Sequence, residues 1–151
     1  MIVDTQDIKL PIAESLFEIG SIIGPEQSKE TLFGALDYIL KEPSDYLKLC
    51  AIKNLAKFVE QFEKQTRENL IDVFLVLQKD PKKWRVRHSI SRQLKELSHI
   101  YDPETIFKYI FPISLKLCND GVSEVRVQAA SQIVHVINNF KSEEHLYEMA
   151  I

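Results

Sequence analysis

An apolar stripe that recurs every 39 residues is the feature that most constrains how this chain can fold. The stripe occurs four times, and each time five apolar residues follow one another at steps of 4, 4, 3 and 4. These steps place the five side chains on one face of an α-helix. A fixed period of about 40 residues built from helix pairs is typical of a stacked helical solenoid. The four stripes are Ile8, Ile12, Leu16, Ile19, Ile23; Leu47, Ala51, Leu55, Phe58, Phe62; Val86, Ile90, Leu94, Leu97, Tyr101; and Val125, Ala129, Ile133, Val136, Phe140.

The stripes predict an all-α protein, an α-α superhelix (solenoid) of about three and a half repeats in a single array over residues 1–151. Each repeat pairs a helix A with a helix B, and helix B carries the stripe. The outermost helices of a solenoid need polar outer faces, yet the last stripe is as apolar as the others. We therefore expect a fragment of a longer array, or a short protein that stacks end to end with a partner. The expected boundaries are a half-repeat at about 6–23, repeats at about 28–62, 66–101 and 103–140, and the start of a further helix A at about 142–151.

Short polar residues mark several expected helix starts. Asp80 and Asp102 each precede a proline, so each is expected to cap a helix whose first residue is that proline. Pro43, Ser44 and Asp45 are together expected to open another helix, because a short polar residue can accept a free backbone N–H there. The helices that these residues would open run over about 44–62, 81–100 and 103–118. Further candidate caps are Ser28, Thr66 and Ser142.

Three local signals predict where the helices are interrupted. Gly24 and Pro25 form a stop and turn signal after the first stripe. Pro112 lies inside an apolar helical segment and should kink it or loosen a turn. Gln78 stands where the equivalent positions of the other repeats hold Ile39 and Leu117. The helix that contains Gln78 is therefore expected to end early, and the loop after it to be one residue longer.

The charge and cysteine content exclude several classes of function. The formal net charge is -3, whereas a nucleic-acid-binding surface needs clustered basic charge. Cys50 and Cys118 are too few for a disulfide framework and lack the spacing of metal ligands. No apolar run is long enough to cross a membrane, and the N-terminal segment lacks the pattern of a secretory signal. The cytosol, and also the nucleus, is the expected compartment.

Neither a metal site nor a catalytic centre is indicated by the sequence. His88 and His99 lie about three helical turns apart, too far to share a metal ion, and His135 and His145 are expected on different helices. No phosphate-binding loop, dinucleotide-binding motif or nucleophile elbow is present. We therefore expect a protein that is not an enzyme and that binds no cofactor.

A column of basic residues runs beside the stripe, and an acid precedes three of its members. The column is Lys9, Lys48, Arg87 and Arg126, and the acids are Glu42, Asp80 and Asp120. An acid followed after about five residues by Val-Arg resembles the HEAT repeat, clearest at 80–87 and 120–130. The string Trp-Arg-Val-Arg at 84–87 resembles the scaffold (A) regulatory subunits of type 2A serine/threonine phosphatases, and regulatory subunits of the related type 4 phosphatases are similar.

This resemblance implies a non-catalytic scaffold that binds a catalytic or regulatory subunit of a serine/threonine phosphatase. It also implies that Asp80, Arg87, Asp120 and Arg126 form a hydrogen-bonded ladder between repeats. In such scaffolds the loops between helices A and B form the binding ridge. The corresponding segments of this chain are 41–46, 79–85 and 118–124.

Trp84 is the strongest candidate contact residue on this ridge. It is the only tryptophan of the chain, and its register equivalents are the small polar residues Asp45 and Ser123. Tryptophan and arginine are enriched among the residues that dominate binding energy. Alternatively, Trp84 packs over the lengthened loop of its own chain and contacts no partner. The candidate protein-binding residues are Lys82, Lys83, Trp84, Arg85, Asn119, Asp120 and Glu124.

Two other functions share the predicted fold. A helical-repeat nucleic-acid-binding protein would need a basic concave face, which the net charge does not favour. A helical-repeat transport adaptor would differ only in its partner. No membrane binding is expected, and self-association end to end is an open alternative.

Overall fold

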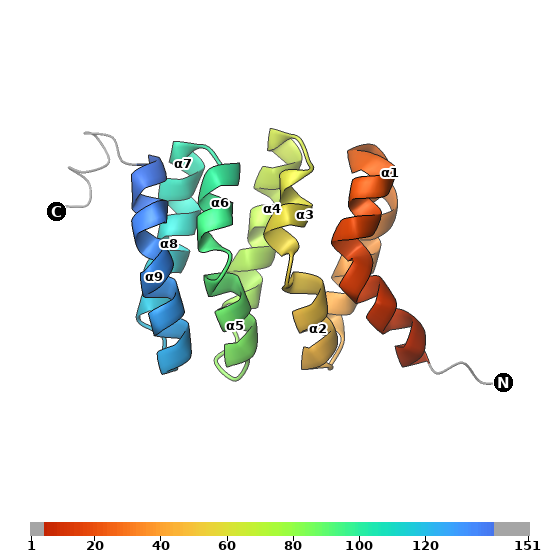
Figure 1. Ribbon diagram of the computed structural model, residues 1–151, viewed down its shortest axis with the longest axis horizontal. Coiled ribbons are helices and arrows are strands. Elements are labelled where there is room, and N and C mark those ends of the chain that lie inside the picture. The colour runs from red at the N-terminus through yellow and green to blue at the C-terminus, as the bar shows by residue number, and fades with distance from the viewer. Residues whose placement is uncertain (1–4, 141–151) are drawn as a thin grey trace. The chain divides into compact units, whose positions relative to one another are not determined.

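The computed structural model describes residues 5–140, and within that range every regular element is helical. The prediction of an all-α chain is therefore confirmed, and the helices pack in the manner of a helical-repeat solenoid (Figure 1). The expected helix at about 142–151, with its candidate cap Ser142, lies outside the described residues. The chain forms two compact units, 1–63 and 64–151, and each is described by itself.

The first unit contains a long interrupted helix and two short ones. Helix α1 spans Thr5–Lys41, and its backbone leaves the helical conformation at Gly24, where φ is 82° and ψ is 170°. The expected stop at Gly24 is thus confirmed. Helices α2 (Asp45–Ile52) and α3 (Leu55–Glu60) follow, and both pack against α1. Phe33, Phe58 and Phe62 meet edge to face, with ring centroids 5.0 to 6.2 Å apart.

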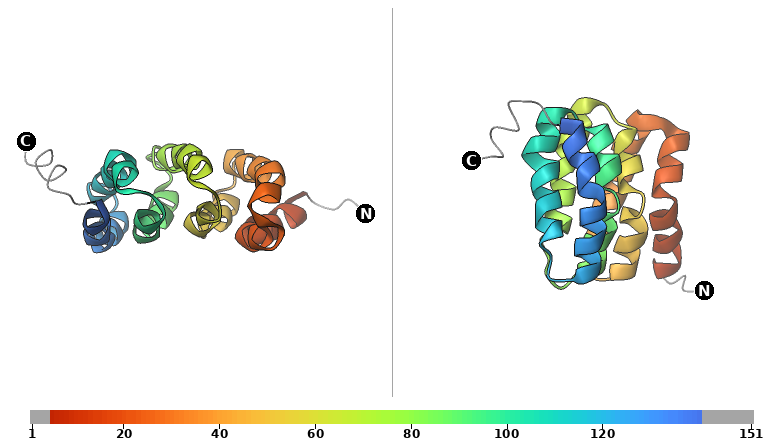
Figure 2. Two further views of the ribbon diagram at one scale, coloured as in Figure 1. Left: turned by 90° about the horizontal axis from the view of Figure 1, so that it is seen from above. Right: turned by 60° about the vertical axis from the view of Figure 1, so that its left-hand side comes forward.

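The second unit has two layers (Figure 2). One layer holds α4 (Lys64–Leu77), α7 (Pro103–Thr105), the π-helical turn η1 (Ile106–Ile110) and α8 (Phe111–Cys118). The other holds α5 (Trp84–Ser91), α6 (Leu94–Ile100) and α9 (Ser123–Phe140). Helix α9 packs against α5, α6 and α8, so it joins the two layers.

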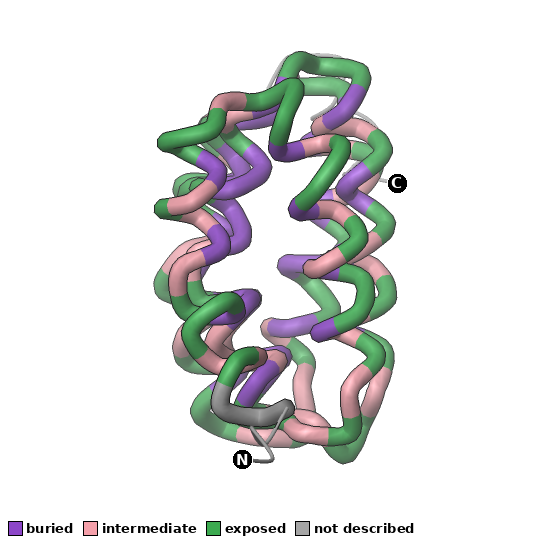
Figure 3. Tube along the Cα trace, turned by 90° about the vertical axis from the view of Figure 1, so that its right-hand side faces the viewer, coloured by how far each residue is buried: buried purple, intermediate pink, exposed green. Residues whose placement is uncertain are grey.

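Buried residues lie on the inward-facing sides of the helices (Figure 3). Many of them belong to the last three stripes, whose members are all buried except Ile133, which is half-buried. The first stripe differs, because Ile8, Ile12 and Ile23 are 37% to 54% exposed. The stripe therefore marks the buried face of α2, α3, α5, α6 and α9, and it does so less completely in α1.

Two predicted helices are each divided in two. We expected continuous helices over about 44–62 and 81–100, and this was wrong, because breaks occur at Asn54 and Gln93. These residues are 39 apart, so both breaks lie at the same place in the repeat. At Gln93 the backbone N–H bonds to Ile90 O, and the side-chain amide donates to Ser89 O at 3.0 Å. The side chain thus satisfies the carbonyl that the break leaves free.

The observed helix starts show which of the expected capping residues cap a helix. Asp102 caps α7 by accepting from Thr105 N, as expected, and of the three residues expected to open α2 it is Ser44 that caps it, by accepting from Leu47 N. The expected cap at Asp80 was wrong, since α5 begins four residues later at Trp84. Ser28 and Thr66 were also wrong as caps, because both lie inside helices, α1 and α4.

Two further irregularities agree with the expectations in kind. Helix α4 ends at Leu77, so Gln78 lies just beyond it, and loop 78–83 is two residues longer than loop 119–122 between α8 and α9, where we expected one extra residue. The turn before Pro112 is widened, because Phe111 N bonds to Ile106 O five residues back. A proline cannot donate to the carbonyl four residues earlier, and a π-turn accommodates that loss.

Candidate functional site

Two loops lie at the same end of the second unit and have the same internal turn (Figure 1). Loop 78–83 joins α4 to α5, and loop 119–122 joins α8 to α9. In the first loop Asp80 Oδ1 accepts from the Lys82 backbone N–H at 2.9 Å. In the second loop Asp120 Oδ1 accepts from the Val122 backbone N–H, also at 2.9 Å. An aspartate that binds its own backbone two residues on stabilises a tight turn, so both loops are locally ordered.

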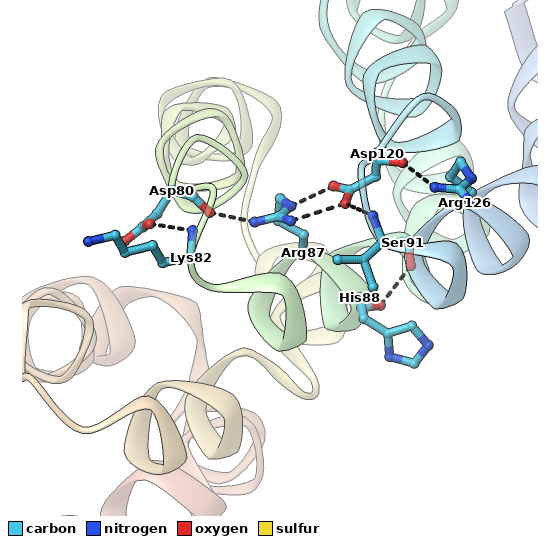
Figure 4. A network of polar contacts seen from close by, with 8 residues as sticks. Asp80, Lys82, Arg87, His88, Ser91, Asp120 and Arg126 are labelled. Carbon is cyan, nitrogen blue, oxygen red and sulfur yellow. Dashed lines mark hydrogen bonds and ion pairs between the residues drawn. The ribbon is translucent and has the colours of Figure 1, made fainter.

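Arg87 connects the two loops (Figure 4). Its Nε donates to Asp120 Oδ2 at 2.5 Å, and its Nη2 donates to Asp120 Oδ1 at 3.0 Å. Its Nη1 donates to the backbone carbonyl of Asp80 at 2.5 Å. One planar guanidinium therefore binds a carboxylate with two parallel bonds and reaches the other loop with a third.

The Arg87–Asp120 ion pair is largely withdrawn from solvent, with the two side chains 8% and 7% exposed. The hydrogen bond from Arg87 is the main reason that the pKa of the Asp120 carboxyl lies below its ordinary value. Asp120 therefore stays ionised and keeps its bonds to Arg87 at neutral pH.

The same motif recurs along the chain with small changes. Arg126 Nη1 donates to Asp120 O at 2.7 Å, as Arg87 does to Asp80 O. In the first unit Lys9 Nζ binds Glu42 Oε1 at 2.7 Å, at positions two periods before Arg87 and Asp120. The structure thus joins the predicted ladder residues, but it is the carbonyl of Asp80, and not its carboxylate, that accepts from Arg87.

Trp84 is the first residue of α5 and is half-buried. Its ring carries the Arg85 guanidinium 4.6 Å from its centroid and lies edge-on to His88 at 6.5 Å. Lys82 and Arg85 are exposed, and Lys83 is half-buried. Trp84 therefore has local packing on one side while it remains accessible at the end of a loop.

The candidate residues of the second loop are engaged locally but remain at the surface. Asn119 is exposed, and its Nδ2 donates to Leu115 O at 3.0 Å at the end of α8. Glu124 is exposed, and its carboxylate accepts from Ser123 Oγ at 2.9 Å. Together with loop 78–83 and Trp84, these residues form what we call the loop surface, which comprises residues 78–85 and 119–124.

The structure also shows a pocket that we did not predict from the sequence. It has a volume of about 340 Å³ and lies between the two loops. Its lining includes Gln78, Lys79, Lys116 and the Arg87–Asp120 pair. The one sequence signal for it was the polar Gln78 at a position that is apolar in the equivalent helices.

Within the described range the structure offers few other sites. No group of three or more histidine, cysteine, aspartate or glutamate side chains lies close enough to hold a metal ion. None of the described helices is both long and apolar enough to cross a membrane. Cys50 and Cys118 are half-buried thiols, and burial raises the pKa of each.

Comparison with known proteins shows similarity to phosphatase regulatory subunits. The chain is 30% identical over 122 residues to serine/threonine-protein phosphatase 4 regulatory subunit 1 of Homo sapiens, and the Mus musculus and Rattus norvegicus proteins match equally well. The match covers 79% of this chain but only 13% of each relative, so the chain corresponds to a small part of their length. No protein-family model matches the sequence. The resemblance to regulatory subunits of type 4 phosphatases is thereby confirmed.

Proposed function

We propose that this chain is a non-catalytic HEAT-repeat segment of a phosphatase regulatory subunit, and that it binds a catalytic or regulatory subunit of a serine/threonine phosphatase. The relatives are regulatory subunits of a type 4 phosphatase, which favours that type over type 2A as the source of the partner. The loop surface is the proposed contact. Stacked helices hold it rigid, and its side chains provide the contacts.

The observation that carries this proposal is the bond network of Arg87. It joins loops 78–83 and 119–122 through three hydrogen bonds, so both loops are held in place before a partner arrives. A preorganised surface loses less conformational entropy on binding. Trp84 follows directly on one of these loops and is half-buried. A partner could cover the part of its ring that is still exposed, as expected for an aromatic anchor residue.

The proposal predicts that Trp84→Ala weakens binding without unfolding the chain. The purified chain is immobilised, and binding of purified type 4 and type 2A catalytic subunits is measured by biolayer interferometry. An anchor residue contributes about 2 kcal/mol or more, so the Kd should rise by about thirtyfold or more. The midpoint of thermal unfolding should change little, because the ring is only half-buried.

Tyr109→Ala on η1 is the matched control, since Tyr109 is also half-buried but lies outside the loop surface. It should leave the Kd unchanged. A large fall in the unfolding midpoint of the Trp84 variant with binding intact would assign Trp84 to packing. The absence of binding to any phosphatase subunit would refute the proposed function.

The other two functions give different outcomes in parallel experiments. Salt-sensitive binding to duplex DNA in a filter assay would support a nucleic-acid-binding protein. Recovery of transport cargo or receptors, in place of a phosphatase subunit, would support an adaptor. The similarity to phosphatase regulatory subunits favours neither. Localisation in the cytoplasm and end-to-end self-association remain predictions.

A further inference from the structure

The pocket between loops 78–83 and 119–122 carries an excess of positive charge. Lys79 and Lys116 line it, and both side chains are exposed. Arg87 and Asp120 also line it, but they form an ion pair with each other. The described residues provide no ion-pair partner for either lysine. The pocket is therefore complementary to an anionic group.

Gln78 adds a second and independent feature to this pocket. It is 6% exposed, and its Nε2 donates to Leu75 O at 3.2 Å. Its Oε1 is buried and has no hydrogen-bond donor among the described residues. Buried polar atoms without a partner are uncommon in folded proteins, because they lose their bonds to water and gain none in return.

Packing does not require a polar residue at this position. The equivalent residues one period away, Ile39 and Leu117, are apolar and 2% and 1% exposed. A leucine at position 78 would therefore suit the local core. We expect the buried amide of Gln78 to lower the stability of the unbound chain, and a ligand that supplies a donor would compensate for this.

We propose that this pocket binds an acidic, extended segment of a partner protein. A carboxylate of the segment pairs with Lys79 and Lys116, and a neighbouring peptide N–H donates to Gln78 Oε1. The Gln78 amide must turn toward the pocket, which releases the bond from its Nε2 to Leu75 O, and the last torsion of a glutamine side chain is soft enough to allow this. A peptide carries a carboxylate and a donor side by side, whereas a phosphodiester carries no donor. The inference rests on the proposed function only in taking a protein as the partner.

A peptide titration followed by NMR tests the inference without a phosphatase. The full chain, labelled with ¹⁵N, is titrated with an acetylated and amidated peptide of alternating Glu and Gly, and with the same peptide in which Gln replaces Glu. The acidic peptide should shift the side-chain amide of Gln78 and the backbone amides of Asn119 and Gly121. The double variant Lys79→Glu, Lys116→Glu should abolish these shifts. Equal shifts with the neutral peptide, or no shift at these residues, would refute the inference.

The same experiment distinguishes other anions. Inorganic phosphate and a single-stranded oligonucleotide are titrated at matched concentrations. If either of them shifts the three residues more strongly than the acidic peptide does, the pocket is a site for phosphate groups and the inference is wrong.

Gln78→Leu supplies a second signature that a purely structural role would not produce. The variant should have a higher unfolding midpoint than the wild-type chain, and it should bind the acidic peptide about fivefold more weakly, as expected for the loss of one hydrogen bond. Gln27→Leu, at an exposed position of α1, is the matched control and should change neither quantity. Tighter or unchanged peptide binding by the Gln78 variant would contradict the inference.

The two proposals can fail separately. If the chain binds the acidic peptide at this pocket but captures no phosphatase subunit, the proposed function is wrong and the inference holds. If it captures a catalytic subunit and Gln78→Leu and the lysine variants leave that affinity unchanged, the proposed function holds and the pocket plays no part in it.

Discussion

Arg87 is the residue on which the geometry of the loop surface depends. It donates to both oxygens of Asp120 and to the carbonyl of Asp80, so its guanidinium contacts two loops at once. A lysine can place one ammonium group near one acceptor, as Lys9 does with Glu42. The arginine therefore gives the second unit a defined arrangement that a lysine at this position would not provide.

Arg87→Ala should lower the free energy of unfolding by about 3 kcal/mol, because it leaves the Asp120 carboxylate buried without its partner. Chemical denaturation with urea at pH 7 measures this change. Arg126→Ala is the control, since Arg126 is exposed and donates to the Asp120 carbonyl, which leaves no buried charge behind when it is removed. Its cost should be about 1 kcal/mol or less. Similar costs for the two variants would contradict the role given to Arg87.

The ion pair should also make stability depend on pH in a defined direction. The pKa of Asp120 is lower in the folded chain than the ordinary value of about 3.9, because Arg87 binds the charged form. The pair therefore contributes fully above about pH 4, and its contribution is lost as the pH falls through the folded pKa. The difference in unfolding free energy between the wild-type chain and Asp120→Asn should shrink from pH 6 to about pH 3. A difference that stays constant over this range would rule out the pair as the cause.

At the scale of the element, α1 shows how a helix can be interrupted with little loss of hydrogen bonding. Gly24 adopts φ 82° and ψ 170°, a conformation that side chains with a Cβ rarely reach. Ser28 lies four residues later, and its hydroxyl donates to Gly24 O at 2.7 Å. The serine thus satisfies a carbonyl at the break, which explains its burial inside α1.

Gly24→Ala should lower the free energy of unfolding by about 1–3 kcal/mol. An added Cβ would meet nothing within 4 Å, so the cost would come from the backbone alone. Gly34→Ala is a close control, because Gly34 is in the same helix and an added Cβ would also meet nothing within 4 Å. That variant should gain up to about 1 kcal/mol from helix propensity. Thermal unfolding of both variants measures the two effects, and a loss of stability in both would argue against backbone strain at Gly24.

The helix starts show why sequence signals predicted some elements and not others. Asp80 and Asp102 both precede a proline, but only Asp102 caps a helix. Helices α2, α5 and α9 each begin two residues before the first member of their stripe, at Asp45, Trp84 and Ser123. Packing of the stripe therefore decides where these helices begin, and a local capping signal that lies too early forms a turn in the loop instead.

The breaks between α2 and α3 and between α5 and α6 were harder to predict. The stripe continues without change through Asn54 and Gln93, because α3 and α6 keep the same buried face as α2 and α5. Periodicity reports which face is buried, and it does not report whether the hydrogen-bond ladder is continuous.

At the scale of the whole molecule, the net charge is negative, but the surface around the two loops of the second unit carries several positive side chains. The chain has a net charge of -3, yet Lys79, Lys82, Arg85 and Lys116 are exposed around the two loops of the second unit. Surface charges act over about one Debye length, roughly 8 Å at physiological ionic strength. The local basic charge, and not the net charge, should therefore govern how a partner approaches the loop surface.

Binding of the proposed phosphatase partner should consequently weaken as salt is added. The association rate should fall as the ionic strength rises toward about 0.15 M, while the dissociation rate changes less. Stopped-flow measurements at several salt concentrations test this. Lys82→Glu should reduce both the association rate and its salt dependence. An association rate that is independent of salt would show that the basic residues do not guide the encounter.

Part of the candidate site was accessible from sequence, and part needed the fold. The register slip after Gln78 and the lone Trp84 indicated loop 78–83 as unusual, and the acid and arginine columns indicated the ladder. The pocket could not be predicted, because Lys79 and Lys116 are far apart in sequence and come together only when α4 and α8 lie in one layer. The use of the Asp80 carbonyl in place of its carboxylate also depends on the turn that the loop adopts.

The bond from Arg87 to two loops has a consequence for how such a surface can diversify. The distance between the loops is determined by one inward-facing side chain, two backbone turns and a carboxylate, all of which lie beneath the exposed tips. Side chains at the tips can therefore be exchanged to recognise a different partner without moving the loops relative to each other. Selectivity could thus be redesigned through the exposed residues of the loop surface alone, if Arg87, Asp80 and Asp120 are kept to hold the spacing.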